Sequence, residues 1–200
     1  MCTKLLLRNN EVNTRYLFTS ERLGFRNWSH DDLPQFAAMN GDADVMEFFP
    51  NTLSEAESRN FITRLIDHYT KYRHNYYAVE LKATGEFIGF IGLAYQVYES
   101  DFTPATDIGW RLKKSVWGNG YATEGALRCV QHAFKTLGKE KLVSTCTVHN
   151  TQSENVMRKI GMKKMGTFKH SRLKEYPAYE TCVWYKMSKE DYLNSVASHA

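Results

Sequence analysis

Two glycines, Gly118 and Gly120, separate a run typical of a β-strand, residues 107–112, from a run typical of an α-helix, residues 121–137. The first backbone N–H groups of a helix have no acceptor within the helix, and the helix dipole favours negative charge there. Because glycine lacks a Cβ atom, the backbone at these positions can take positive φ angles and approach a ligand closely. The spacing therefore suits a phosphate or pyrophosphate. A tight strand-to-helix turn without a ligand would carry the same short motif.

Two familiar phosphate-binding loops do not match this turn. A Walker loop ends in Gly-Lys-Ser or Gly-Lys-Thr, whereas Gly138 and Lys139 are followed by Glu140. The dinucleotide-binding fingerprint requires a third Gly or Ala where this chain has Thr123. Its acidic residue about 20 positions later would be Glu140, which lies before the next expected strand and not at its end. The sequence therefore favours neither an NTPase nor a dehydrogenase.

The composition indicates a single folded domain. A chain of 200 residues, 42% of them hydrophobic, can bury a substantial core. We expect this domain to cover residues 1–200, with an N-terminal extension at residues 1–18 and a frayed tail at residues 194–200. Lys and Arg are dispersed and the net charge is +4, which does not indicate a surface for direct nucleic-acid binding. No apolar run reaches membrane-spanning length, so we expect no membrane association.

Cysteine usage bears on the compartment. Four widely separated cysteines, Cys2, Cys129, Cys146 and Cys182, form no C-x-x-C pair. This spacing indicates reduced core thiols in a cytoplasmic protein, although one disulfide pair would also fit the count. The sequence does not distinguish a monomer from a homodimer.

Hydrophobic periodicity predicts the secondary structure. Alternation predicts strands at residues 23–28, 76–81, 86–95, 107–112, 141–148, 163–168 and 180–187, with an added edge strand at residues 16–18. Helical spacing predicts helices at residues 33–41, 54–69, 121–137 and 151–160, and a closing helix after Ser188. Ser29 with Asp32, and Ser54 with Glu57, have the spacing of helix-start caps. The order of elements fits one domain of the α/β class with a mixed sheet.

Three sequence blocks together resemble the GCN5-related N-acetyltransferases (GNAT). The family's loop Q/R-x-x-G-x-G/A corresponds to residues 117–122, with Trp117 in place of Gln or Arg. A second block runs from Asn150-x-x-Ser153 to residues 159–162, and a third comprises residues 20–28. The run Trp-Gly-x-Gly-Tyr-Ala-Thr-Glu is typical of the branch that acetylates ribosomal-protein N-termini (RimJ/RimL-like). The resemblance extends over nearly the whole chain.

The resemblance implies a fold and an acyl donor. The fold is a central, mostly antiparallel sheet with flanking helices, in which one parallel pair of strands splays apart to admit acetyl-CoA. The pyrophosphate would lie on the N–H groups of residues 118–122, and the pantetheine arm would run along residues 107–112. No metal is implied. The contacts to acetyl-CoA implied by the resemblance are Trp110, Arg111, Leu112, Trp117, Gly118, Asn119, Gly120, Tyr121, Ala122, Asn150 and Ser153.

The implied reaction sets the catalytic requirements. Amide formation from a thioester needs a neutral amine, and an N-terminal amine has a pKa of about 7.7–8. A base removes a proton, directly or through water, and a donor stabilises the developing oxyanion. An acid can protonate the departing CoA thiolate. Direct attack requires no enzyme nucleophile, and the oxyanion donor is expected to be a backbone N–H near Trp110.

Two residues are candidates for proton transfer. Ser153 is the candidate acid, because Met157 replaces the tyrosine that the wider family often uses; a helix-start hydroxyl or a simple cofactor contact is the alternative. Asp107, at the head of the strand beside the cofactor, is the candidate base, with a solvated strand-start carboxylate as the alternative. We expect His149 to pack or face solvent, and Glu124 to serve the helix dipole or a hydrogen bond of the fold.

The sequence therefore predicts an acetyl-CoA-dependent N-acetyltransferase whose preferred acceptor is a protein N-terminal amine, such as that of a ribosomal protein. A small amine (a polyamine, an amino acid or an aminoglycoside) is the alternative acceptor, and a non-catalytic acyl-CoA sensor is the alternative class. The expected acceptor wall consists of Trp28, Phe48, Phe49 and Tyr95. Phe48 and Phe49 belong to a hydrophobic loop, residues 45–50, which would equally suit core packing.

Overall fold

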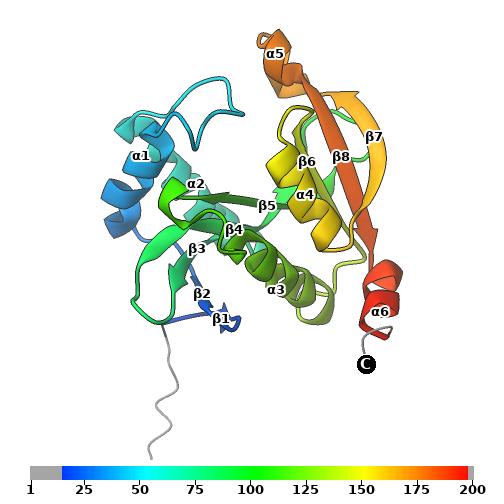
Figure 1. Ribbon diagram of the computed structural model, residues 1–200, viewed down its shortest axis with the longest axis horizontal. Helices are drawn as coiled ribbons and strands as arrows, with labels where there is room; N and C mark the ends of the chain where they lie inside the picture. Colours follow the sequence, from blue (N-terminus) through cyan, green and yellow to red (C-terminus); the bar gives the residue numbers. More distant parts are fainter. Residues whose placement is uncertain (1–14, 198–200) are drawn as a thin grey trace, which may run out of the picture.

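The computed structural model describes residues 15–197, which form an eight-stranded sheet in the order β1-β2-β3-β4-β5-β6-β8-β7 (Figure 1). The strands are β1 (Phe18–Thr19), β2 (Leu23–Arg26), β3 (Tyr76–Leu81), β4 (Phe87–Gln96), β5 (Ala105–Leu112), β6 (Lys141–Thr147), β7 (Lys163–Lys169) and β8 (Thr181–Ser188). The helices are α1 (Leu33–Gly41), α2 (Glu55–Tyr72), α3 (Tyr121–Lys135), α4 (Thr151–Lys159), α5 (Pro177–Glu180) and α6 (Lys189–Ala197). The expected α/β class with a mixed, mostly antiparallel sheet is confirmed.

Helices cover both faces of the sheet. Successive side chains of a strand point to opposite faces, so a strand with apolar residues at successive positions needs a covering layer on each face. On β3, Tyr77 and Val79 join the core cluster that includes Cys129 of α3. Ala78, between them, joins the second cluster, which lies under α1 and α2 and includes Phe36. Figure 1 shows α3 crossing in front of the strands, with α2 behind them. The chain thus builds one core layer on each side of β3 and β4.

A buried ion network joins β2, β3 and the start of α1. Arg26 donates through Nη1 and Nη2 to the two carboxylate oxygens of Asp32 (2.8 and 2.6 Å) and through Nε to Glu80 (2.7 Å). Asp32 also completes the expected capping box with Ser29. Both carboxylates are less than a tenth exposed. Glu80 also pairs with Arg15 (2.6 Å), so loss of Arg26 would leave the buried carboxylate of Asp32 without an ion pair. The network therefore holds α1 against the sheet.

Some elements depart from their expected bounds. Strand β2 ends at Arg26, so Trp28 lies in the connection to α1. The edge strand is Phe18–Thr19 and not residues 16–18. Helix α3 ends at Lys135 and not at residue 137.

The C-terminal helix is longer than expected. Helix α6 continues to Ala197, where the sequence predicted a frayed tail from residue 194. The ring of Tyr192 stacks on Phe134 of α3 at a centroid distance of 5.2 Å, which anchors α6 to the core. The predicted N-terminal extension lies outside the described residues, except for residues 15–18. Within residues 15–197, no helix is long and apolar enough to cross a lipid bilayer.

Strands β5 and β6 form the only parallel pair among the described strands, and they separate almost at once. Their register contains one partnered pair, Asp107 with Val143. Beyond it, β5 stays paired with β4 as far as Leu112, and β6 stays paired with β8 as far as Thr147. The hydroxyl of Ser144 donates to the carbonyl oxygen of Ile108 (2.7 Å) at the point of separation. The splayed parallel pair implied by the resemblance is confirmed.

Candidate active site

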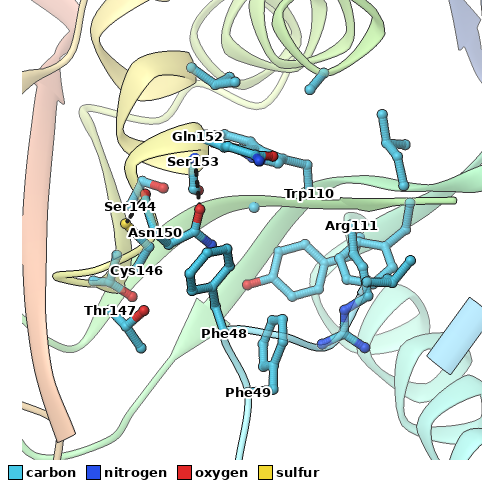
Figure 2. A pocket seen from close by; sticks show the side chains of 18 of the residues that line it. Phe48, Phe49, Trp110, Arg111, Ser144, Cys146, Thr147, Asn150, Gln152 and Ser153 are labelled. Atoms are coloured by element: carbon cyan, nitrogen blue, oxygen red, sulfur yellow. Dashed lines mark hydrogen bonds between the residues drawn. The ribbon is translucent and has the colours of Figure 1, made fainter. Parts of the chain in front are cut away.

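A cavity of about 740 Å³ occupies the gap between β5 and β6 (Figure 2). The turn before α3 and the first turn of α4 line one part of it, and residues 44–50 line another. Figure 2 shows Asn150 and Ser153 of α4 on one side of the cavity and Phe48 and Phe49 on the other. Its volume lies in the range of small-molecule sites, roughly 300–1,000 Å³. The gap between the strands is therefore large enough to hold a small molecule.

The glycine turn presents free backbone N–H groups to this cavity. Gly118 and Gly120 have φ angles of 78° and 79°, as the sequence predicted. Gly120 is the N-cap of α3 and provides no side chain to cap the helix. Trp117 donates through Nε1 to the carbonyl oxygen of Leu112 (2.9 Å), which ties the turn to the end of β5. Uncapped N–H groups at the positive end of a helix dipole fit a pyrophosphate.

The other side chains around the turn serve the fold. The side-chain amide of Asn119 donates to the carbonyl oxygens of Val116 and Trp117 (both 3.1 Å), and Asn119 does not line the cavity. Glu124 accepts hydrogen bonds from the Ser20 hydroxyl (2.6 Å) and from the backbone N–H and Nε of Arg22 (2.8 and 2.6 Å). The expected structural role of Glu124 is confirmed. Asn119 can reach a ligand only through its backbone.

The first turn of α4 faces the same gap. Asn150 caps the helix through Oδ1, which accepts the backbone N–H of Ser153 (2.9 Å), and both residues line the cavity. Met157, at the position of the family's tyrosine, is fully buried in the core. The thiol of Cys146 donates to the carbonyl oxygen of Asn150 (3.6 Å). Burial raises the pKa of this thiol to about 12, so Cys146 is not a thiolate at neutral pH.

Asp107 lies where β5 and β6 part, and it is not the solvated carboxylate that the sequence left open. It lines the cavity but is only 7% exposed. Burial raises its pKa to about 7, and the hydrogen bond that Tyr76 Oη donates to Oδ2 (2.5 Å) opposes that rise. The side chain of Gln96 donates in turn to Tyr76 Oη (3.3 Å). A carboxyl with a pKa near neutrality suits proton transfer at physiological pH.

Two of the four expected acceptor residues lie away from the cavity. Phe48 and Phe49 line it. Trp28 instead packs on Phe36 in the core and donates through Nε1 to the carbonyl oxygen of Tyr76 (2.5 Å). The ring of Tyr95 lies against Tyr72. Neither aromatic side chain lines the cavity, and Trp28 holds the backbone of Tyr76.

The structure also adds residues that the sequence did not single out. Tyr76, Gln96 and Phe90 line the cavity, and nothing in their spacing distinguishes them from ordinary core residues. Alternation along β5 places Arg111 on the face of Asp107 and not on that of Trp110. The Arg111 side chain accordingly stacks on Phe90 of the second core cluster. Arg111 stays a predicted cofactor contact through its backbone, while its side chain lies on the face opposite to Trp110.

Comparison with known proteins agrees with this geometry. Residues 22–163 match the family model of the acetyltransferase (GNAT) domain. The Bacillus subtilis protein YnaD, an uncharacterised N-acetyltransferase, is 28% identical over 153 residues, which cover 76% of this chain and 85% of YnaD.

Two solved structures with coenzyme A share the fold. RimL, the ribosomal L7/L12 α-N-protein acetyltransferase, superimposes with a TM-score of 0.68 at 20% identity, covering 84% of this chain and 95% of RimL. The aminoglycoside acetyltransferase AAC(6′)-Ib superimposes with a TM-score of 0.70 at 16% identity, covering 87% of this chain and 99% of that enzyme. Two enzymes with different acceptors are equally similar, so the fold alone does not select the acceptor.

We expect Asp107→Asn to stabilise the protein at pH 8 by up to about 4 kcal/mol, because one unit of pKa shift corresponds to about 1.4 kcal/mol. The folded carboxyl holds its proton more tightly than the unfolded one, so wild-type stability falls as pH rises from about 4 to about 7. The gain should therefore disappear below about pH 4. Urea unfolding of both proteins between about pH 4 and about pH 8 measures this difference in the free energy of unfolding.

Asp67→Asn, an exposed site on α2, is the matched control and should change the free energy of unfolding by less than about 0.5 kcal/mol. A pH-independent effect of Asp107→Asn would contradict the raised pKa.

Proposed function

This chain belongs to the acetyltransferase (GNAT) family and uses acetyl-CoA as its acyl donor, and we propose that it acetylates a protein N-terminal amine by direct attack in a ternary complex. The observation that carries this proposal is the gap between β5 and β6, which is flanked by uncapped N–H groups at one end and by a near-neutral carboxyl within it. Asp107 lines the cavity at the point where β5 and β6 part, where a carboxyl can serve proton transfer, and this position favours the enzyme over an acyl-CoA sensor.

The backbone supports the placement of acetyl-CoA. The N–H groups of residues 118–122 would hold the pyrophosphate. Past Asp107, the edge of β5 that faces β6 has no strand partner, so the pantetheine arm can pair with it as a partial extra strand. Trp110, Leu112, Trp117, Tyr121 and Ala122 line the cavity along that path. Residues 15–197 contain no group of three or more His, Cys, Asp or Glu side chains that could hold a metal ion.

The side chains support a route for each proton. Asp107, as the carboxylate, would accept the proton of the incoming ammonium, directly or through one water. Its pKa of about 7 lies close to that of an N-terminal amine, about 7.7–8, so this transfer costs little. A backbone N–H of β5 near Trp110 would stabilise the developing oxyanion. Ser153, across the gap, would donate a proton to the departing thiolate, and the second proton of the acylated nitrogen would restore the Ser153 hydroxyl, directly or through water.

Direct attack is supported by the state of the two thiols that line the cavity. Burial raises the pKa of Cys146 to about 12 and that of Cys182 to about 11, which leaves no appreciable thiolate to form an acetyl-enzyme. The amine would therefore attack the thioester itself.

For the acceptor, the pKa of an N-terminal amine is close to that of Asp107, the proposed base. Phe48 and Phe49 offer an apolar entrance to the cavity. A small-molecule amine is the alternative, since the same cavity could enclose one. We place the reaction in the cytoplasm, where acetyl-CoA is available.

We expect thiol release from acetyl-CoA to increase with pH through an inflection near 7, because only ionised Asp107 accepts the proton. Asp107→Asn should lower kcat by about 100-fold or more and remove that inflection, with the Kd for coenzyme A unchanged. Stopped-time thiol assays with peptide and amine panels provide both quantities. Asp67→Asn, outside the cavity, should behave as wild type. Full activity of Asp107→Asn would exclude Asp107 as the base.

We expect Ser153→Ala to lower kcat by at least about tenfold, with the Kd for coenzyme A changing by less than about threefold, if the hydroxyl supplies the proton to the thiolate. Single-turnover kinetics together with calorimetric titration of coenzyme A separate the two effects. Ser115→Ala, exposed and outside the cavity lining, is the control. A weakened Kd with an unchanged kcat would show that Ser153 is a cofactor contact only.

A further inference from the structure

We propose that the acceptor carries a carboxylate, which pairs with the guanidinium of Arg111 at the acceptor end of the cavity. This inference rests on the proposed acetyl transfer and specifies its substrate class as an acidic amine.

Arg111 is a buried cation with no counter-ion in the described chain. It lines the cavity, is 9% exposed, and makes no ion pair within residues 15–197. Its Nη1 donates to Asn40 Oδ1 (2.8 Å), whereas its buried Nε has no hydrogen-bond partner there. The rings of Phe49 and Phe90 lie 4.1 and 5.4 Å from the guanidinium carbon. Figure 2 shows the guanidinium extending from β5 toward Phe49.

Such a charge is costly unless something neutralises it. Burial lowers the pKa of Arg111 to about 10, so the group stays cationic at neutral pH. The nearby acidic groups do not compensate it. Asp44, on the wall of the cavity, is paired with Lys114 (2.5 Å), and Asp107 accepts its hydrogen bond from Tyr76. A planar carboxylate is the ligand that best matches the donor fork of arginine.

The guanidinium is also held in place by a dedicated chain of hydrogen bonds. Asn40 of α1 accepts from Arg111 and donates through Nδ2 to Ser58 Oγ of α2 (3.0 Å). Both Asn40 and Ser58 are fully buried. Two helices thus contribute neutral polar groups that orient the cation but leave its charge uncompensated. A residue needed only for packing would require neither the charge nor this support.

The position of Arg111 on the strand sets the shape of the acceptor. Asp107 and Arg111 lie on one face of β5, four residues and therefore about 13 Å apart at their Cα atoms. Gly109 lies between them, where a Cβ atom would come within 3.1 Å of the Tyr76 ring and 3.4 Å of the Asp107 carboxylate. The Tyr76 ring thus fills the space above Gly109, and a chain that runs from an amine near Asp107 to a carboxylate at Arg111 would pass over that ring. A polyamine would instead bring a second cation to Arg111.

Two sources supply this chemistry, an ω-amino acid or a peptide with an acidic side chain near its N-terminus, and matched substrate pairs distinguish them. One pair is 6-aminohexanoate and its amide; the other is Ala-Glu-Ala-amide and Ala-Gln-Ala-amide. We expect kcat/KM to be at least about tenfold higher for the acid in one of the pairs, through KM, because hydrogen bonds to charged groups contribute that much. The responding pair identifies the source. Equal values for acid and amide in both pairs would overturn the proposal.

Binding separates this inference from acetyl transfer itself. Calorimetric titration of both pairs into the protein with coenzyme A reports on Arg111 without turnover. Tighter binding of an acid, without thiol release, would support the carboxylate site and refute the proposed reaction. Thiol release with equal affinities for acid and amide would refute the carboxylate site alone.

Three variants test the role of Arg111. Arg111→Met should bring the acid-to-amide ratio to about one. Asn40→Asp places a carboxylate of the chain itself against Arg111, so it should also abolish the preference, and it tests the proposal even where Arg111→Met does not fold. Arg64→Met removes an arginine that stacks on Phe61 (5.2 Å) but does not line the cavity, and it should keep the preference. A preference that survives Arg111→Met or Asn40→Asp would overturn the proposal.

Discussion

The parting of β5 from β6 after a single paired residue is the constraint on which the rest of the structure depends. Two strands can separate inside a sheet only if each keeps its hydrogen bonds on the other side. Strand β5 does so with β4, and β6 does so with β8. The separation leaves backbone N–H and C=O groups facing a cavity. In the interior of a protein, such groups require a partner, and a bound molecule can provide it.

The cavity is chemically different at each point along β5. Beyond its end, the glycine turn and the N-terminus of α3 offer partial positive charge. Near its start, burial raises the pKa of Asp107 to about 7. Tyr76 donates a hydrogen bond to this carboxylate, and Gln96 donates one to Tyr76. On the face of Asp107, and opposite to Trp110, Arg111 brings a full positive charge to the rings of Phe49 and Phe90. The alternation of side chains thus gives the two faces of this one strand different chemistry.

The sequence was sufficient for features that depend on local chemistry. The positive φ angles of the glycine turn, the two capping boxes and the strand–helix–strand unit follow from residue type and spacing, and the structure has them. The resemblance to a family supplied the splayed pair and the acyl donor. Phe48 and Phe49 were assigned to the cavity, but with core packing as an equal alternative.

Features that depend on long-range packing were beyond the sequence. Trp28 and Phe49 are both aromatic residues near α1, yet only the three-dimensional path of the chain buries the first and exposes the second to the cavity. The contact of Tyr76 with Asp107 joins residues 31 positions apart. The pKa of Asp107 follows from that burial, so it was equally inaccessible. The sequence shows that side chains alternate along β5, but it does not show which face of the strand packs against which helices.

The most direct test of the central claim is amide hydrogen exchange with and without acetyl-CoA. The N–H groups of residues 118–123 and the β6-facing N–H groups of residues 108–112 should exchange rapidly in the free protein and slowly in the complex. In Gly120→Val, acetyl-CoA should give little protection, because a β-branched residue cannot adopt the φ angle of 79° without strain. Unchanged exchange in both segments of the wild type at saturating acetyl-CoA would contradict the account.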